Sequence, residues 1–294
     1  NSFLDQQGNL WICNHWNVTK ISFSTYACSL QAMDAGFETR AFLIDEKDEL
    51  WTASKKGYIR IYQPDGSLKG YLTPEGTISS QPISFQKNIY CFIEDENGII
   101  WMGSKLDGLF RLTRDGKDHF QIRQFTHQED NPYSLSYNSI YSIYQDHQKR
   151  IWIGCYGGGL NLLEETTEGE IRFIHSGNQL EEYPKDHFTK VRYVTEVNNA
   201  ILVCTTEGLL TFSSEFKQPE DICFYKNLRH PDEVSSLSSN DVTYVYTDNR
   251  KATYVLTFTG GINKILSENL LSEHIEFKPY TTKDGLPSDL VQSM

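Results

Sequence analysis

The sequence predicts an all-β fold, a β-propeller whose blades each contain four antiparallel strands. Two observations predict it. One pattern of residues, centred on a tryptophan, recurs about every fifty residues, and each copy divides into short β-prone segments separated by tight turns. No segment has the length and the 3.6-residue period of an amphipathic helix. A β-sandwich is the alternative architecture, but it does not explain the period.

The clearest copy of the pattern lies at residues 141–162. Its first segment alternates until the polar run 146–149, which predicts a tight turn. The apolar triplet 151–153 has the composition of a buried strand. Three glycines at 157–159 then turn the chain back into a third strand.

The pattern can be followed through six copies. The position of the central tryptophan is occupied in turn by Trp11, Trp51, Trp101, Trp152, Leu202 and Tyr254. The copies around Leu202 and Tyr254 match least well. The chain begins and ends inside a copy, so we expect residues 1–294 to form a single propeller domain that is a fragment of a longer chain.

Each repeated position has a mechanical explanation. An aspartate opens the first turn, because its carboxylate can bond the turn backbone. The tryptophans are expected to be buried between neighbouring sheets. Two residues later a small residue, Gly103 or Gly154 in the best copies, indicates that a neighbouring backbone or aromatic ring approaches closely. Gly108 and Gly159 allow the second turn to close.

Composition and charge exclude several classes of function. The formal net charge of −12 argues against nucleic acid or an anionic membrane as a partner, since both select basic patches. The six cysteines and eight histidines have no metal-binding spacing. We therefore predict no metal and no cofactor. No apolar run is long enough for a transmembrane helix.

The pattern Asp-x-x-Gly-x-(Leu/Ile)-Trp-(Ile/Met)-Gly, followed by Gly-Gly-Leu, resembles the two-component regulator propeller repeat, and the loop sequences at 134–138 and 284–287 are also similar to that family. The resemblance covers the whole chain, well in four copies and poorly in two. It implies a seven-bladed parent ring in the periplasmic sensor region of a hybrid two-component system. The parent would be a homodimeric inner-membrane protein with a histidine kinase, an adjacent propeller or β-sandwich domain, and an oligosaccharide ligand.

In a propeller, the loops from the second to the third strand and the connections between blades share one face, where variable side chains build binding sites. Our predicted ligand- or interface-binding rim consists of His15, Trp16, Lys55, Lys105, Asp107, Asn138, Tyr156, Glu207 and Asn240. Trp16 is the only tryptophan outside the packing position, so its ring can stack on a sugar. The alternative is that Trp16 covers a seam or contacts a neighbouring domain, and that the polar residues belong to solvated loops.

Two classes of function remain, a non-catalytic sensory module and a propeller enzyme, either a glycosidase or a lyase similar to streptogramin lyase. The repeated aspartates lie on separate blades and do not pair. A sialidase-like site needs three convergent arginines, and only Arg40 and Arg192 are candidates for inward positions. No nucleophile-elbow, zinc-protease or phosphate-loop motif occurs. The sequence therefore favours the sensory module, with no catalytic residue in this domain.

Overall fold

A computed structural model describes residues 2–4, 10–13, 18–21 and 38–291, with side chains from residue 38 onward. The chain divides into two compact units, residues 1–36 and 37–294, which we describe separately, so the single domain remains a prediction. The first unit contains β1 (Ser2–Leu4), β2 (Leu10–Cys13) and β3 (Val18–Ile21), paired in that order. The side chain of Trp11 and the residues His15 and Trp16 lie outside the described part.

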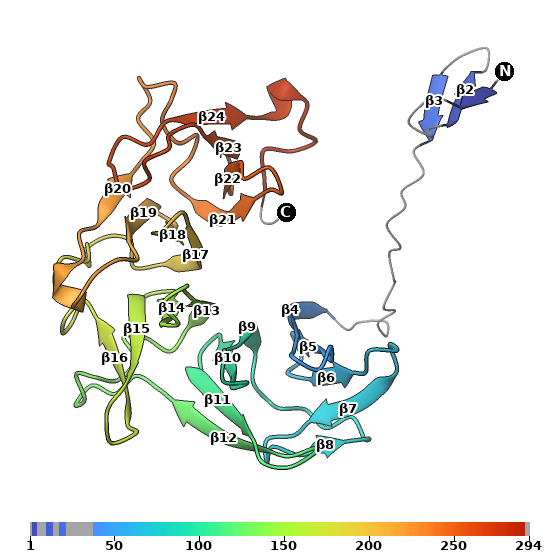
Figure 1. Ribbon diagram of the computed structural model, residues 1–294, viewed down its shortest axis with the longest axis vertical. Helices are drawn as coiled ribbons and strands as arrows, with labels where there is room; N and C mark the ends of the chain where they lie inside the picture. The colour runs from blue at the N-terminus through green and yellow to red at the C-terminus, as the bar shows by residue number, and fades with distance from the viewer. Residues whose placement is uncertain (1, 5–9, 14–17, 22–37, 292–294) are drawn as a thin grey trace. The chain divides into compact units, whose positions relative to one another are not determined.

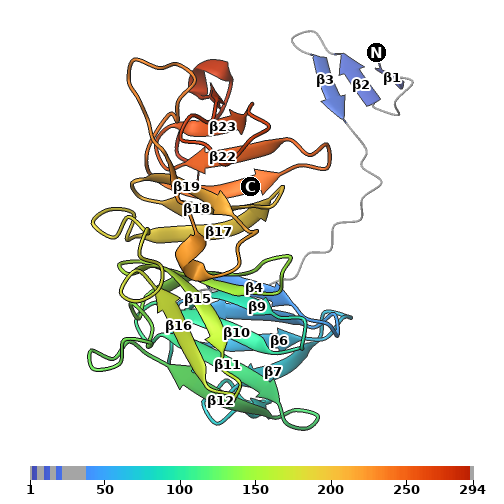
Figure 2. The same cartoon turned by 60° about the vertical axis from the view of Figure 1, so that its left-hand side comes forward.

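The second unit consists of five antiparallel sheets, which follow one another along an arc with the first strand of each innermost (Figures 1 and 2). The inner strands contact one another in the order β4, β9, β13, β17, β21. The sheets comprise β4 (Thr39–Ile44), β5 (Leu50–Ser54), β6 (Ile59–Tyr62), β7 (Leu68–Leu72) and β8 (Ile78–Ser79); β9 (Ile89–Glu94), β10 (Ile100–Ser104), β11 (Leu109–Arg114) and β12 (Phe120–Phe125); β13 (Ile140–Gln145), β14 (Ile151–Cys155), β15 (Gly159–Glu165) and β16 (Ile171–His175); β17 (Val191–Val197), β18 (Ala200–Thr205), β19 (Gly208–Ser213) and β20 (Tyr225–Asn227); and β21 (Val242–Thr247), β22 (Thr253–Thr257), β23 (Gly261–Ile265) and β24 (Phe277–Tyr280).

This architecture confirms the predicted all-β propeller fold, and four of the five sheets have the four predicted strands, whereas the first has a fifth, β8. Each copy of the sequence pattern corresponds to one sheet, and its central position lies on the second strand. The described residues contain two short 3-10 helices, η1 (Pro219–Asp221) and η2 (Thr282–Asp284), and no α-helix. In that part of the chain no helix has the length and apolarity needed to cross a membrane.

The turn aspartate and the tryptophan are joined by a hydrogen bond in the three copies for which the structure describes both side chains. In the β9–β12 sheet, Oδ1 of Asp95 accepts the backbone N–H groups of Asn97 and Ile99 at 2.9 and 3.0 Å. Its Oδ2 accepts the indole N–H of Trp101 at 2.8 Å. The same indole bond measures 3.0 Å between Trp51 and Asp45 and 2.9 Å between Trp152 and Asp146.

The three tryptophans are buried between sheets, as predicted, with exposed fractions of 0%, 2% and 0% for Trp51, Trp101 and Trp152. Trp101 packs in one apolar cluster with Ile140 and Ile153 of the following sheet. Leu202 is also fully buried, in a cluster that reaches the last sheet. The position therefore keeps its packing role where the tryptophan is lost.

The small residue two positions after the tryptophan makes room for the next sheet, but its neighbour differs from our expectation. A Cβ atom on Gly103 would lie 2.5 Å from Cγ2 of Ile140, and one on Gly154 would lie 2.6 Å from Cγ1 of Val191. Ile140 and Val191 begin the first strands of the following sheets. Our expectation that a backbone or an aromatic ring approaches here is therefore wrong. A branched aliphatic side chain fills the space.

The second-turn glycines also contact the connection to the next sheet. Gly108 and Gly159 have φ angles of 76° and 73°, a region that favours glycine. Their N–H groups bond the carbonyls of Asn138 and Thr189 at 3.0 and 2.8 Å. Each turn is therefore fastened to the strand entry beside it.

A further repeated contact, missed in the sequence, joins the first turns of neighbouring sheets. The N–H after the turn aspartate donates to a side chain at the end of the next inner strand: Glu46 to Glu94 at 2.6 Å, Glu96 to Gln145 at 3.1 Å, and His147 to Glu196 at 2.9 Å. In the last pair the imidazole Nδ1 of His147 also lies 2.5 Å from Glu196 Oε1.

We predict that Gly154→Val destabilises the protein by about 1–3 kcal/mol, because the new side chain overpacks the space held by Val191. Urea unfolding measures the loss. Glu165→Val, at an exposed position of the neighbouring strand β15, is the matched control and should change the free energy of unfolding by no more than about 0.5 kcal/mol. Equal stability of Gly154→Val and the parent would contradict the close approach.

We predict a pH-dependent contribution from His147. The hydrogen bond to Glu196 raises the pKa of His147 above 6.5, so the folded state binds its proton more tightly than the unfolded state does. The resulting stability is fully present below the unfolded pKa and is lost as the pH rises through the folded pKa. The stability advantage of the parent over His147→Gln should therefore be fully present at low pH and should shrink over the pH interval that begins at about 6.5 and extends upward. Parallel stability curves across that interval would exclude the effect.

Candidate functional site

The described rim residues lie on the loops that the repeat predicted. Lys105 and Asp107 lie between β10 and β11, Tyr156 between β14 and β15, and Glu207 between β18 and β19. Lys55 follows β5, and Asn138 and Asn240 lie in connections between sheets. Their role as a binding rim remains a prediction.

Several of these groups are already engaged with their neighbours. Lys55 pairs with Glu38 at 2.9 Å, and Asp107 pairs with Lys87 at 2.7 Å. The side-chain oxygen of Asn138 accepts the N–H of His127 at 2.7 Å. Lys105 is exposed. These contacts hold the loops in place.

Glu207 and Asn240 are brought together in one groove, which we call the rim groove. Its volume is about 390 Å³, and it is lined by Pro184, His187, Phe188, Thr206, Glu207, Lys226, Leu228 and Asn240. Phe188 is buried beneath it. The imidazole Nδ1 of His187 lies 3.1 Å from Glu207 Oε2, and the Asn240 oxygen accepts the Arg229 N–H at 2.6 Å. An apolar floor thus meets hydrogen-bonding groups at the edge.

Tyr156 belongs to a row of stacked rings, the tyrosine stack, formed by Tyr90, Tyr141 and Tyr156. The centroids of Tyr141 and Tyr156 are 4.6 Å apart at an interplanar angle of 19°, and those of Tyr90 and Tyr141 are 4.8 Å apart. Arg40 lies 5.4 Å from the Tyr90 centroid. Burial raises the pKa of Tyr141, which keeps its phenol neutral.

Arg192 connects the tyrosine stack to the rim groove. Its Nε and Nη2 donate to the two carboxylate oxygens of Asp241 at 2.8 and 3.0 Å. Its guanidinium lies 5.7 Å from the Tyr156 centroid and 5.8 Å from that of Phe258. Because Asp241 directly follows Asn240, the stack and the groove meet on one connection.

The tyrosine stack was missed in the sequence, although a signal was present. The second residue of successive inner strands is Arg40, Tyr90, Tyr141 and Arg192. These positions line up only when the copies are aligned on their turns. Arg40, Tyr90 and Tyr141 also line a central cavity of about 410 Å³.

The groups nearby are suited to binding more than to nucleophilic attack. Burial raises the pKa values of the Cys91 and Cys155 thiols to about 12, so both are protonated at neutral pH. Cys155 donates to the carbonyl of Tyr137 at 3.4 Å. Within the described ranges, no three His, Cys, Asp or Glu side chains are grouped so that they could hold a metal ion.

Comparison with known proteins identifies the repeat. The family model of the two component regulator propeller matches residues 84–105 and 134–157. The chain is 28% identical over 132 residues to histidine kinase P4 of Formosa agariphila. That match covers 42% of this chain and 9% of the kinase.

Two solved structures have similar folds. One is the extracellular domain of a putative hybrid two component system from B. thetaiotaomicron, 18% identical, with a TM-score of 0.53 over 98% of this chain and 41% of that chain. The other is PorZ of Porphyromonas gingivalis, a surface component of the type-IX secretion system, 14% identical, with a TM-score of 0.59 over 97% and 40%. The chain thus spans about two fifths of each. The fold is therefore that of a β-propeller, and two segments of this chain match the two component regulator propeller family.

Proposed function

We propose that this chain is the non-catalytic, ligand-sensing propeller of a hybrid two-component system and acts in the periplasm. The family match supports the sensory class. The similarity to histidine kinase P4 supports a histidine kinase in the same protein. The fold shared with an extracellular domain is consistent with a position outside the cytoplasm.

The rim groove is the observation that carries the ligand proposal, and we propose an oligosaccharide. Its volume of about 390 Å³ lies within the range of about 300–1,000 Å³ that is common for ligand sites. Sugars present apolar C–H faces and hydroxyl edges. Phe188 and Leu228 can receive the faces, while Glu207 and Lys226 can bond the hydroxyls.

The stiffness of the sheets limits the kinds of motion by which this unit could signal. Buried tryptophans, hydrogen-bonded turns and hydrogen bonds between neighbouring sheets leave little room for internal rearrangement. Useful motion would come from this unit shifting against an adjacent propeller, a β-sandwich domain or a second copy of the parent chain. A ligand shifts such a balance only through different affinities for the two arrangements, and inverting a 1:99 population takes about 5.5 kcal/mol.

We predict that Glu207→Gln and Lys226→Gln each weaken oligosaccharide binding about tenfold, because each removes one charged hydrogen-bonding group. Calorimetric titration of the full parent protein with an oligosaccharide panel measures the affinity. Glu181→Gln, an exposed position outside the groove, is the matched control.

Two results would count against the proposal. Parent-like affinity of both groove variants would exclude the rim groove as the site. Turnover of an oligosaccharide by the purified chain, abolished by a single rim substitution, would favour a propeller enzyme.

A further inference from the structure

The first two of the five sheets meet at a junction that contains three carboxyl groups and one guanidinium. Asp45 and Glu46 lie between β4 and β5, Glu94 ends β9, and Arg114 ends β11. Nη2 of Arg114 donates to Oδ2 of Asp45 at 2.7 Å, and the N–H of Glu46 donates to Oε2 of Glu94 at 2.6 Å. Both hydrogen bonds cross from one sheet to the other. We call these four residues the acidic junction.

Glu94 is the buried member whose negative charge has the weakest support. Its side chain is 9% exposed, and among the residues that the structure describes no group donates a hydrogen bond to its buried Oε1. A carboxylate in such a position is costly. Burial therefore raises the pKa of Glu94, and the charges of Asp45 and of the more exposed Glu46 act in the same direction. The Glu46 N–H and Arg114 oppose this shift without cancelling it.

Arg114 cannot neutralise all three carboxyl groups. Its Nη2 lies 3.6 Å from Oε1 of Glu94, beyond hydrogen-bond distance, because it already donates to Asp45. Its Nε lies 4.0 Å from Oε1 of Glu46. Burial works against the charge of Asp45, but hydrogen bonds from Arg114, the turn backbone and Trp51 outweigh it and lower the pKa of Asp45. The guanidinium therefore belongs mainly to Asp45.

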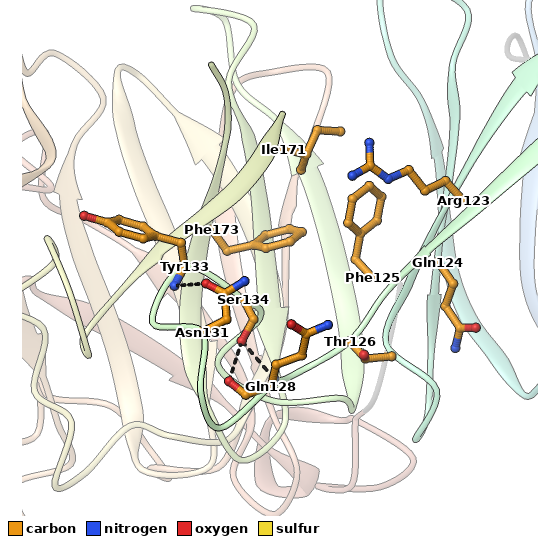
Figure 3. A pocket seen from close by; sticks show the side chains of 10 residues that line it. All are labelled: Arg123, Gln124, Phe125, Thr126, Gln128, Asn131, Tyr133, Ser134, Ile171 and Phe173. Carbon is orange, nitrogen blue, oxygen red and sulfur yellow. Dashed lines mark hydrogen bonds between the residues drawn. The ribbon is translucent and has the colours of Figure 1, made fainter. Parts of the chain in front are cut away.

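The arginine on the outer strand of the same sheet faces another seam. The guanidinium of Arg123, on β12, lies over Phe125, 4.8 Å from the ring centroid (Figure 3). It lines a cleft between β12 and β16, on the side of the following sheet. The acidic junction lies on the side of the preceding sheet, so Arg123 does not assist Arg114 there.

The next junction along the arc makes the same hydrogen bond with a neutral group. Gln145 ends β13 as Glu94 ends β9, and its Oε1 accepts the N–H of Glu96 at 3.1 Å. Glu96 follows its turn aspartate just as Glu46 follows Asp45. The bond between neighbouring turns therefore needs a carbonyl oxygen and no charge. A protonated Glu94 provides that oxygen.

We propose that the acidic junction is a pH-sensitive joint, which is tightened by a proton on Glu94 and loosened when that proton leaves. With the proton bound, Arg114 serves Asp45, and Glu94 accepts the Glu46 N–H as a neutral group. Without the proton, Glu94 repels Asp45 and Glu46 across the seam and competes for Arg114. Its register partner on β10, Ile100, is uncharged. Acidity thus regulates how firmly the first sheet is held, whatever ligand the rim groove binds.

The direction of the pH effect follows from proton linkage. The pKa of Glu94 is higher in the folded state than its ordinary value of 4.5, so folding favours the protonated form. The resulting stability is fully present below about pH 4.5 and is lost as the pH rises through the folded pKa. A glutamine at this position cannot lose a proton, so it keeps the junction neutral at every pH.

The test compares urea unfolding of the full chain and of Glu94→Gln from about pH 4.5 to about pH 8.5, an interval that spans the loss of the proton. Both chains carry His147→Gln, which removes the titration of the histidine at another junction. We expect Glu94→Gln to gain stability relative to its parent as the pH rises, by about tenfold in the unfolding constant for each unit between the folded and unfolded pKa values. Glu181→Gln, at an exposed position, is the matched control and should show no such gain.

A difference between Glu94→Gln and its parent that stays constant, or that shrinks as the pH rises, would overturn the proposal. Carbon-13 NMR titration of the Glu94 carboxyl group in the parent, assigned by through-bond correlation, provides a measurement that does not depend on the folding of a variant. A midpoint above 4.5 is expected. A midpoint at or below that value would overturn the joint as well. Neither measurement involves the rim groove, so this proposal and the ligand proposal can fail independently.

Discussion

Three of the sheets depend on one hydrogen bond, from the indole N–H of a buried tryptophan to a buried aspartate. A carboxylate that leaves water is costly unless its oxygens are bonded. Asp95 meets this condition with two turn N–H groups and the indole of Trp101. The same bonds fix the turn and the direction of the ring. The ring then presents a fixed face to the next sheet, and Gly103 lets Ile140 approach it.

Where this bond is lost, the sheet is held by its apolar packing and by the contact between neighbouring turns that the other sheets also have. In the β17–β20 sheet the tryptophan position is Leu202, which cannot donate. That sheet still packs through fully buried apolar residues. The carboxylate of Glu196 also accepts the backbone N–H of His147, in the turn of the preceding sheet. Because the scaffold is fixed by contacts within and between sheets, loops such as those of Glu207 and Asn240 can vary without loss of the fold.

The repeat in the sequence predicts the sheets, the buried tryptophans and the need for small residues after them, because each follows from local pattern and periodicity. It does not predict the Asp95–Trp101 bond, since the same aspartate is explained by the turn alone. Glu207 and Asn240 lie in one groove because of the conformations of two separate loops, which the repeat does not specify. The sharing of Arg114 by three carboxyl groups depends on how two neighbouring sheets pack, which a local pattern does not specify.

The central claim, that the carboxylate and the indole act as one unit, is tested by a double-mutant cycle with Asp95→Ala, Trp101→Phe and the combination. Urea unfolding gives each free energy. A bond to a buried carboxylate predicts a coupling energy of about 1.5–3 kcal/mol, so the double variant should lose less stability than the two single changes added together. Losses that add to within about 0.3–0.5 kcal/mol would contradict the account.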